Sequence, residues 1–85
     1  MKKDWSIDLE HGDYERNISL VIEDGLKAIH VTESGYYVNL VTPAVFGNPV
    51  HYMTDPILNR FQSGVTLKFI DQCGCGGYVL RAWKK

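Results

Sequence analysis

The chain has 85 residues, of which 45% are hydrophobic and 22% charged, and its formal net charge is -1. This length suits one domain, 1–85, with a thin core, because chains usually divide into several domains only well beyond it. The composition excludes collagen-like, coiled-coil and low-complexity proteins. Nine basic against ten acidic side chains leave no basic stripe, so nucleic acid is not an expected partner.

Neither a secretion signal nor a membrane span is predicted. Asp4, Asp8 and Glu10 fall where the apolar core of a signal peptide would lie. The longest strictly apolar stretches, such as residues 20–22, are far shorter than the roughly 18 residues that a bilayer crossing requires. We therefore expect a soluble, cytoplasmic protein that makes no contact with a membrane.

The first half of the chain predicts a strand, a helix and a second strand. Apolar and polar residues alternate over 5–10, which is typical of a strand buried on one side. Asp13 is suited to cap a helix of about five turns, in which apolar residues recur every three or four positions as far as Ile29. Gly25 lies inside this helix, which indicates a close contact of the helix with the sheet there. Residues 36–42 are almost continuously apolar, as expected of a central strand.

The second half predicts a helix and a hairpin. Pro49 marks the start of the helix, and Met53, Ile57 and Phe61 form its apolar stripe. Pro56 costs about 3 kcal/mol inside a continuous helix, so we expect Asp55 to cap a fresh start at Pro56, which gives a broken or kinked segment. The alternating segments 65–70 and 78–83 flank a glycine-rich connection and should form a hairpin.

These elements predict an α+β fold with the order β-α-β-α-β-β. The polar residues of the first strand favour both helices on one face of the sheet, because the other face then remains partly open to solvent. The expected architecture is a two-layer α/β sandwich with a four-stranded mixed sheet and a C-terminal hairpin. Apolar residues on the open face would favour a weak homodimer over a monomer.

The two cysteines of the chain lie in the glycine-rich connection. Cys73 and Cys75 are separated by one residue in the sequence Cys-Gly-Cys-Gly-Gly at 73–77. A disulfide between them would close a small, strained ring, which is reactive rather than a structural staple. Two thiolates also suit a soft metal ion, although tetrahedral zinc needs two further ligands. A reactive loop, a metal or redox site and a plain glycine-rich turn therefore all remain open.

Several segments of the chain together carry a resemblance to a known family. They are the Cys-Gly-Cys-Gly-Gly motif at 73–77 with the short strand after it, residues 4–11, the strand 35–42, and Asp71-Gln72 before the motif. With these features the chain resembles the CGCGG family of radical-SAM-modified peptides, over most of its length.

The resemblance implies that this is a ribosomally made substrate protein, not an enzyme, and that a radical S-adenosylmethionine (radical-SAM) maturase is its partner. It implies modification within Cys73, Gly74, Cys75, Gly76 and Gly77, without any cofactor or metal of the chain's own. A thioether from sulfur to a glycine α-carbon is one possible product, because a thiolate is nucleophilic and a glycine α-carbon is unhindered. Most precursor peptides lack such a long patterned domain, so the modified domain itself is the expected product.

A small metal-binding or thiol-redox domain that uses unmodified Cys73 and Cys75 is the alternative hypothesis. Two copies could complete a four-sulfur site across a dimer. Among other candidates, His11 follows the first strand and His30 and His51 are isolated, without metal-ligand spacing. Asp8 and Glu10 are expected on a solvated face rather than in a pocket. Tyr36, Tyr37 and Tyr52 are expected to serve packing rather than an aromatic site.

Overall fold

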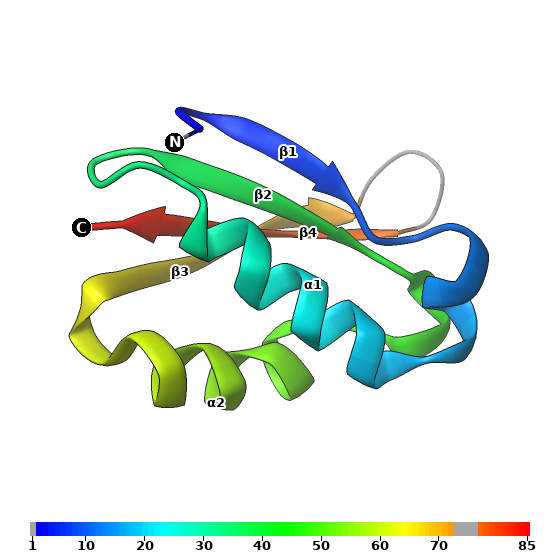
Figure 1. Cartoon of the computed structure of the whole chain (residues 1–85). Coiled ribbons are helices and arrows are strands. Elements are labelled where there is room, and N and C mark those ends of the chain that lie inside the picture. Colours follow the sequence, from blue (N-terminus) through cyan, green and yellow to red (C-terminus); the bar gives the residue numbers. More distant parts are fainter. Residues whose placement is uncertain (1, 73–76) are drawn as a thin grey trace.

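A four-stranded mixed sheet carries both helices on one face in the computed structural model, which describes residues 2–72 and 77–85 (Figure 1). The strands are β1 (Trp5–Asp8), β2 (Tyr37–Thr42), β3 (Val65–Gln72) and β4 (Tyr78–Lys84). The helices are α1 (Ile18–His30) and α2 (Val50–Phe61), and three short 3₁₀ turns cover Gly12–Arg16, Ala44–Phe46 and Gln62–Gly64. The predicted α+β sandwich, with its C-terminal hairpin, is confirmed.

The strand order is β1-β2-β4-β3. β1 runs parallel to β2, whereas β4 is antiparallel to both of its neighbours. β2 therefore occupies an interior position, as its apolar sequence predicts. The last strand in the sequence lies between the second and the third, so β2 and β3 are joined only through β4.

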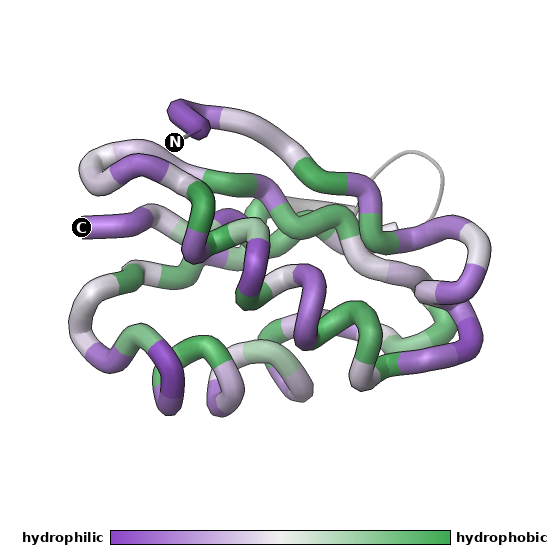
Figure 2. The backbone as a smooth tube through the Cα atoms, in the orientation of Figure 1, coloured by the Kyte–Doolittle hydropathy of each residue, from purple (hydrophilic) through white to green (hydrophobic). Residues whose placement is uncertain are grey.

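The core lies between the sheet and the helices. Alternate residues of β2 are buried, and Leu40 on this strand is paired with the equally buried Leu80 of β4. Figure 2 shows hydrophobic residues recurring at intervals along both helices, with hydrophilic residues between them. The helices contribute the buried side chains Val21, Ala28, Ile29, Met53 and Ile57. The inward-facing residues of the strands, at every second position, and those of the helices, at every third or fourth, thus form one apolar layer.

The first helix begins later than its apolar pattern predicts. Residues 12–16 form a 3₁₀ turn, and Asn17 then takes an extended conformation that separates this turn from α1. The Asn17 side chain accepts a hydrogen bond from the amide of Leu20 at 3.2 Å. The predicted cap at Asp13 is therefore wrong, because Asn17 satisfies a free amide of the first helical turn.

The predicted fresh start at Pro56, capped by Asp55, is also wrong. α2 continues from Val50 to Phe61 with Pro56 inside it, although this proline cannot donate to the carbonyl of Tyr52. Met53 and Ile57 flank it on one stripe and are completely buried. Burial of two such side chains is worth roughly 3–6 kcal/mol, which outweighs the approximately 3 kcal/mol cost of the proline.

Gly25 lies where α1 contacts both the sheet and α2, so the predicted helix-to-sheet contact is present, although the tighter contact is with α2. A Cβ atom at this position would lie 2.6 Å from Cε of Met53 on α2 and 3.6 Å from Cδ1 of Leu40 in the sheet. Glycine thus allows α1 to pack against α2 and β2 at the same time.

The opposite face of the sheet is organised around Arg81. Its guanidinium carbon lies 4.0 Å from the ring centre of Tyr37 and 5.2 Å from that of Trp83. Its Nε donates to Oδ1 of Asn39 at 2.8 Å, and Asn39 in turn donates to Ser6 at 3.1 Å. Cation–π contacts and hydrogen bonds therefore link β1, β2 and β4 on the face that the helices leave uncovered.

Candidate functional site

One end of the sheet brings together three segments that are far apart in the sequence. The pairing of Asp8 with Val41 and of Thr42 with Tyr78 places the end of β1, the end of β2 and the start of β4 side by side. The amide of Leu9 continues this ladder by donating to the carbonyl of Val41 at 2.8 Å. Glu10 after β1, Pro43 after β2 and Gly77 before β4 consequently meet where the Cys-Gly-Cys-Gly-Gly motif ends.

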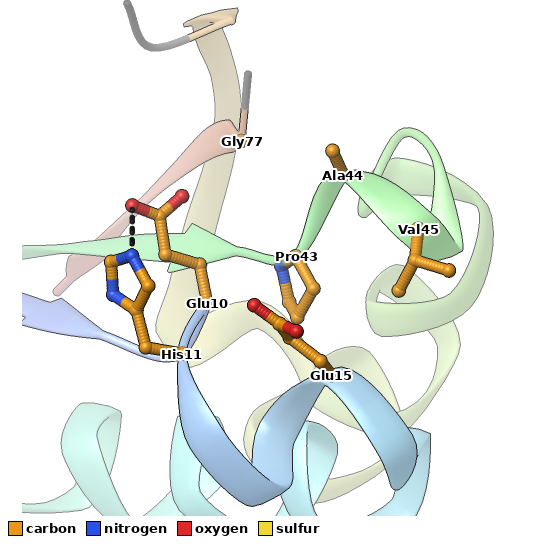
Figure 3. Close-up of a pocket in the computed structure, with 7 residues that line it drawn as sticks. All are labelled: Glu10, His11, Glu15, Pro43, Ala44, Val45 and Gly77. Atoms are coloured by element: carbon orange, nitrogen blue, oxygen red, sulfur yellow. Dashed lines mark ion pairs between the residues drawn. The ribbon is translucent and has the colours of Figure 1, made fainter. Parts of the chain in front are cut away.

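A pocket of about 270 Å³ opens at this end of the sheet. Its lining residues are Glu10, His11, Glu15, Pro43, Ala44, Val45 and Gly77. Figure 3 shows Glu10 and His11 on one side of the pocket, Ala44 and Val45 on the other, and Pro43 and Glu15 between them. The pocket therefore joins a group of ionisable side chains to the last glycine of the motif.

Glu10 is the most enclosed of these ionisable groups. Its side chain is only 10% exposed, whereas that of Asp8 is 59% exposed. The predicted solvated face is therefore correct for Asp8 and wrong for Glu10. The sequence offers no signal for this difference, because both residues alternate onto the polar side of the same segment. The contact of Glu10 with Gly77 depends on how β1 and β4 are each paired with β2.

Gly77 fits tightly at the base of the motif. It is buried, and a Cβ atom in its place would collide with the Glu10 carboxylate and lie 2.8 Å from the carbonyl oxygen of Thr42. Thr42 itself is completely buried, and its hydroxyl donates to the carbonyl of Tyr78 at 3.2 Å. The start of β4 is therefore held closely against the ends of β1 and β2.

Asp8 and His11 form a hydrogen-bonded pair at the rim of the pocket. Nδ1 of His11 lies 2.8 Å from Oδ2 of Asp8, and the amide of Glu10 donates to Oδ1 at 2.9 Å. The Glu10 amide and then the His11 ring lower the pKa of Asp8 below 3.8. The hydrogen bond to Asp8 raises the pKa of His11 above 6.5. The ion pair is consequently strongest between these two values, since acid protonates Asp8 and base deprotonates His11.

Replacing Asp8 with Asn should lower the pKa of His11 towards its ordinary value, because the main partner of the imidazolium is then neutral. NMR titration of the His11 ring protons measures this shift. Glu15→Gln is the matched control, because Glu15 raises the pKa of His11 least among the contributing groups. An unchanged His11 pKa in the Asp8 variant would contradict the pairing.

Asp8, Glu10 and His11 also hold three possible metal donors close together. One donor atom from each residue lies within 4.8 Å of the others. Two carboxylates and an imidazole suit a divalent cation chemically. The hydrogen bond that the His11 ring donates to Asp8, together with the 3.7 Å contact between His11 Nε2 and Glu10, explains this geometry as ion pairing.

The remaining candidates are the other motif residues, two histidines and the tyrosines. Cys73, Gly74, Cys75 and Gly76 lie outside the described residues, so the structure locates Gly77 alone among the predicted modification sites. His30 and His51 are exposed on α1 and α2, apart from His11. Tyr37 packs edge-on against Trp83, and Tyr52 packs against Phe46. These two tyrosines therefore serve packing, as predicted.

The fold and this site define a small α+β domain whose sheet holds the carboxyl end of a cysteine- and glycine-rich motif. Comparison with protein families gives the particular class: the family model described as "Putative radical SAM target protein" matches residues 1–85. The chain therefore belongs to this family of radical-SAM targets. Neither the curated proteins nor the solved structures contain a match. Within the described part of the chain, none of the helices has the length and apolarity needed to cross a membrane.

Proposed function

We propose that this domain is the substrate of a partner radical-SAM maturase, which modifies the Cys-Gly-Cys-Gly-Gly motif. The observation that carries the proposal is the family match over the whole chain, because the family is described as a target of radical-SAM chemistry. The motif supplies suitable groups, since thiolates are nucleophilic and glycine α-carbons lack a side chain. The domain itself has the role of a carrier and performs no catalysis.

The fold supports this role because it holds the motif's carboxyl end at a fixed place. Gly77 is buried against Glu10 and the end of β2, and Thr42 is paired with Tyr78 immediately after it. A maturase that recognised the folded domain would thus find Gly77, the last residue of the motif, in a constant position relative to the sheet. We propose that the domain remains attached to the motif after modification and that its site of action is the cytoplasm.

A thioether from a cysteine sulfur to a glycine α-carbon is our candidate product. Its formation removes one hydrogen from sulfur and one from carbon, and the two electrons released pass to S-adenosylmethionine and the iron–sulfur cluster of the maturase. The modified protein would then lack two hydrogen atoms and one free thiol for each crosslink. Both changes are measurable on the intact protein.

The test compares protein purified from its native host with the same chain produced in a host that lacks the maturase. We expect a difference in intact mass, and fewer titratable thiols in the native protein. The paired variant Cys73→Ser with Cys75→Ser, expressed in the native host, should abolish the difference. Ser63→Ala, at the other end of β3, serves as the control and should leave it unchanged.

Identical masses from the two hosts would refute the proposal. If the maturase-free protein also carried a metal ion, and both of its thiols became titratable only after chelation, the metal-binding alternative with Cys73 and Cys75 as ligands would replace it. Metal analysis of anaerobically prepared protein measures this directly.

A further inference from the structure

Gly77 differs from the other motif positions in that the structure fixes its surroundings. It belongs to the predicted modification segment, yet it is buried at the start of β4. The space where a side chain would project is filled by the Glu10 carboxylate and by the Thr42 carbonyl, 2.8 Å from a Cβ position. Gly64, at the other end of the hairpin, has nothing within 4 Å of the same position. Packing therefore leaves room at position 77 for glycine but not for a larger residue.

The groups that fill this space are themselves held in place. Thr42 is fully buried in an interior strand, and its hydroxyl donates to the carbonyl of Tyr78. The backbone of Glu10 is fixed by the hydrogen bond from its amide to Asp8, and its side chain is 10% exposed. The Glu10 carboxylate can move by rotating, but the Thr42 carbonyl moves only with the strand.

Radical chemistry at an α-carbon needs access to that carbon. The abstracting carbon radical must reach van der Waals contact with a Cα–H bond, and a sulfur that bonds to the carbon needs at least the room of a side-chain atom. Gly77 is buried, and on its side-chain side a carbon atom does not fit unless both the Glu10 carboxylate and the Thr42 carbonyl move.

We infer that Gly77 is the anchoring glycine of the motif, which packs against Glu10 and Thr42 and keeps both of its α-hydrogens. This inference rests on the proposed function, and it excludes Gly77 from the reacting residues. The fifth position of the motif is glycine because β4 starts in contact with the ends of two other strands. The cysteines, by contrast, are present for the proposed modification.

Tandem mass spectrometry of the native-host protein tests the chemical part. Trypsin releases residues 69–81, and fragment ions that contain only 77–81 should have the unmodified mass, while larger fragments that extend into the cysteines carry the change. A mass change on the 77–81 fragments would overturn the inference. If neither the peptide nor the intact protein changed in mass, the proposed function would fail, and the anchoring role would be decided by folding alone.

Thermal unfolding of maturase-free variants tests the anchoring part. Gly77→Ala should lower the unfolding midpoint by at least about 5 °C, because it overpacks a buried contact, whereas Gly64→Ala should shift it by less than about 3 °C. Adding Glu10→Ala to Gly77→Ala should restore part of the loss, since one of the two obstructing groups is then removed. Equal midpoints for the Gly77 and Gly64 variants would overturn the inference.

Discussion

Replacing Leu40 with Ala should lower the free energy of unfolding by about 3–5 kcal/mol. Leu40 is completely buried in β2, is paired with Ile7 and Leu80, and lies beneath the contact of the two helices. Truncation removes the transfer free energy of the lost carbons and leaves a cavity that several elements would have to close. A domain of this size has only about 5–15 kcal/mol of stability, so the variant should be largely unfolded in moderate denaturant.

The neighbouring residue provides the control for this prediction. Val41 lies on the opposite face of the same strand and is only partly buried, so Val41→Ala should cost about 1 kcal/mol or less. Urea unfolding followed by circular dichroism measures both variants. Similar losses from the two substitutions would mean that the helices do not cover the Leu40 face.

Replacing Gly25 with Leu should destabilise the protein by about 3 kcal/mol or more. The first side-chain carbon would already lie 2.6 Å from Cε of Met53, and three further carbons would have to enter the space occupied by Leu40 and Leu9. The two helices would separate, or α1 would lift from the sheet. Gly25→Ala should cost far less, because the flexible end of Met53 can move and alanine favours the helix by about 1 kcal/mol.

Two further variants separate steric conflict from other effects of leucine. Lys27→Leu places the same side chain at a position that is 75% exposed on α1, and it should change stability by no more than about 0.5 kcal/mol. Met53→Ala in the Gly25→Leu protein should restore part of the loss, because it frees volume next to the new side chain. Chemical denaturation of Gly25→Leu, Lys27→Leu, Met53→Ala and the double variant, each against the unsubstituted protein, measures these differences. Additive effects of Gly25→Leu and Met53→Ala would contradict the contact.

Local patterns predicted most of the elements because each pattern depends on one face of one segment. The alternation at 5–10, the apolar run at 36–42 and the hairpin after residue 64 correspond to β1, β2 and β3–β4. The polar face of the first strand correctly predicted that both helices lie on the same face of the sheet. The errors at Asp13 and Pro56 arose where a local preference met a competing effect, namely the Asn17 cap in one case and the burial of Met53 and Ile57 in the other.

The candidate site was only partly predictable, because it depends on register. The sequence identifies the motif at 73–77, but the contact of Gly77 with Glu10 requires strand order β1-β2-β4-β3 and the pairing of Thr42 with Tyr78. The pairings of β1 with β2 and of β2 with β4 join residues more than 30 positions apart, and no local pattern encodes them. The enclosure of Glu10, which sequence reasoning assigned to solvent, follows from the same register.

The position of β4 has a consequence for synthesis on the ribosome. β1 and β2 can pair as soon as they emerge, but β3 joins the sheet only through β4, which is translated after all the other strands. The cysteines at 73 and 75 thus leave the exit tunnel before the strand that completes the sheet. A chain cut before β4 could still pair β1 with β2, but β3 would have no partner strand in the sheet.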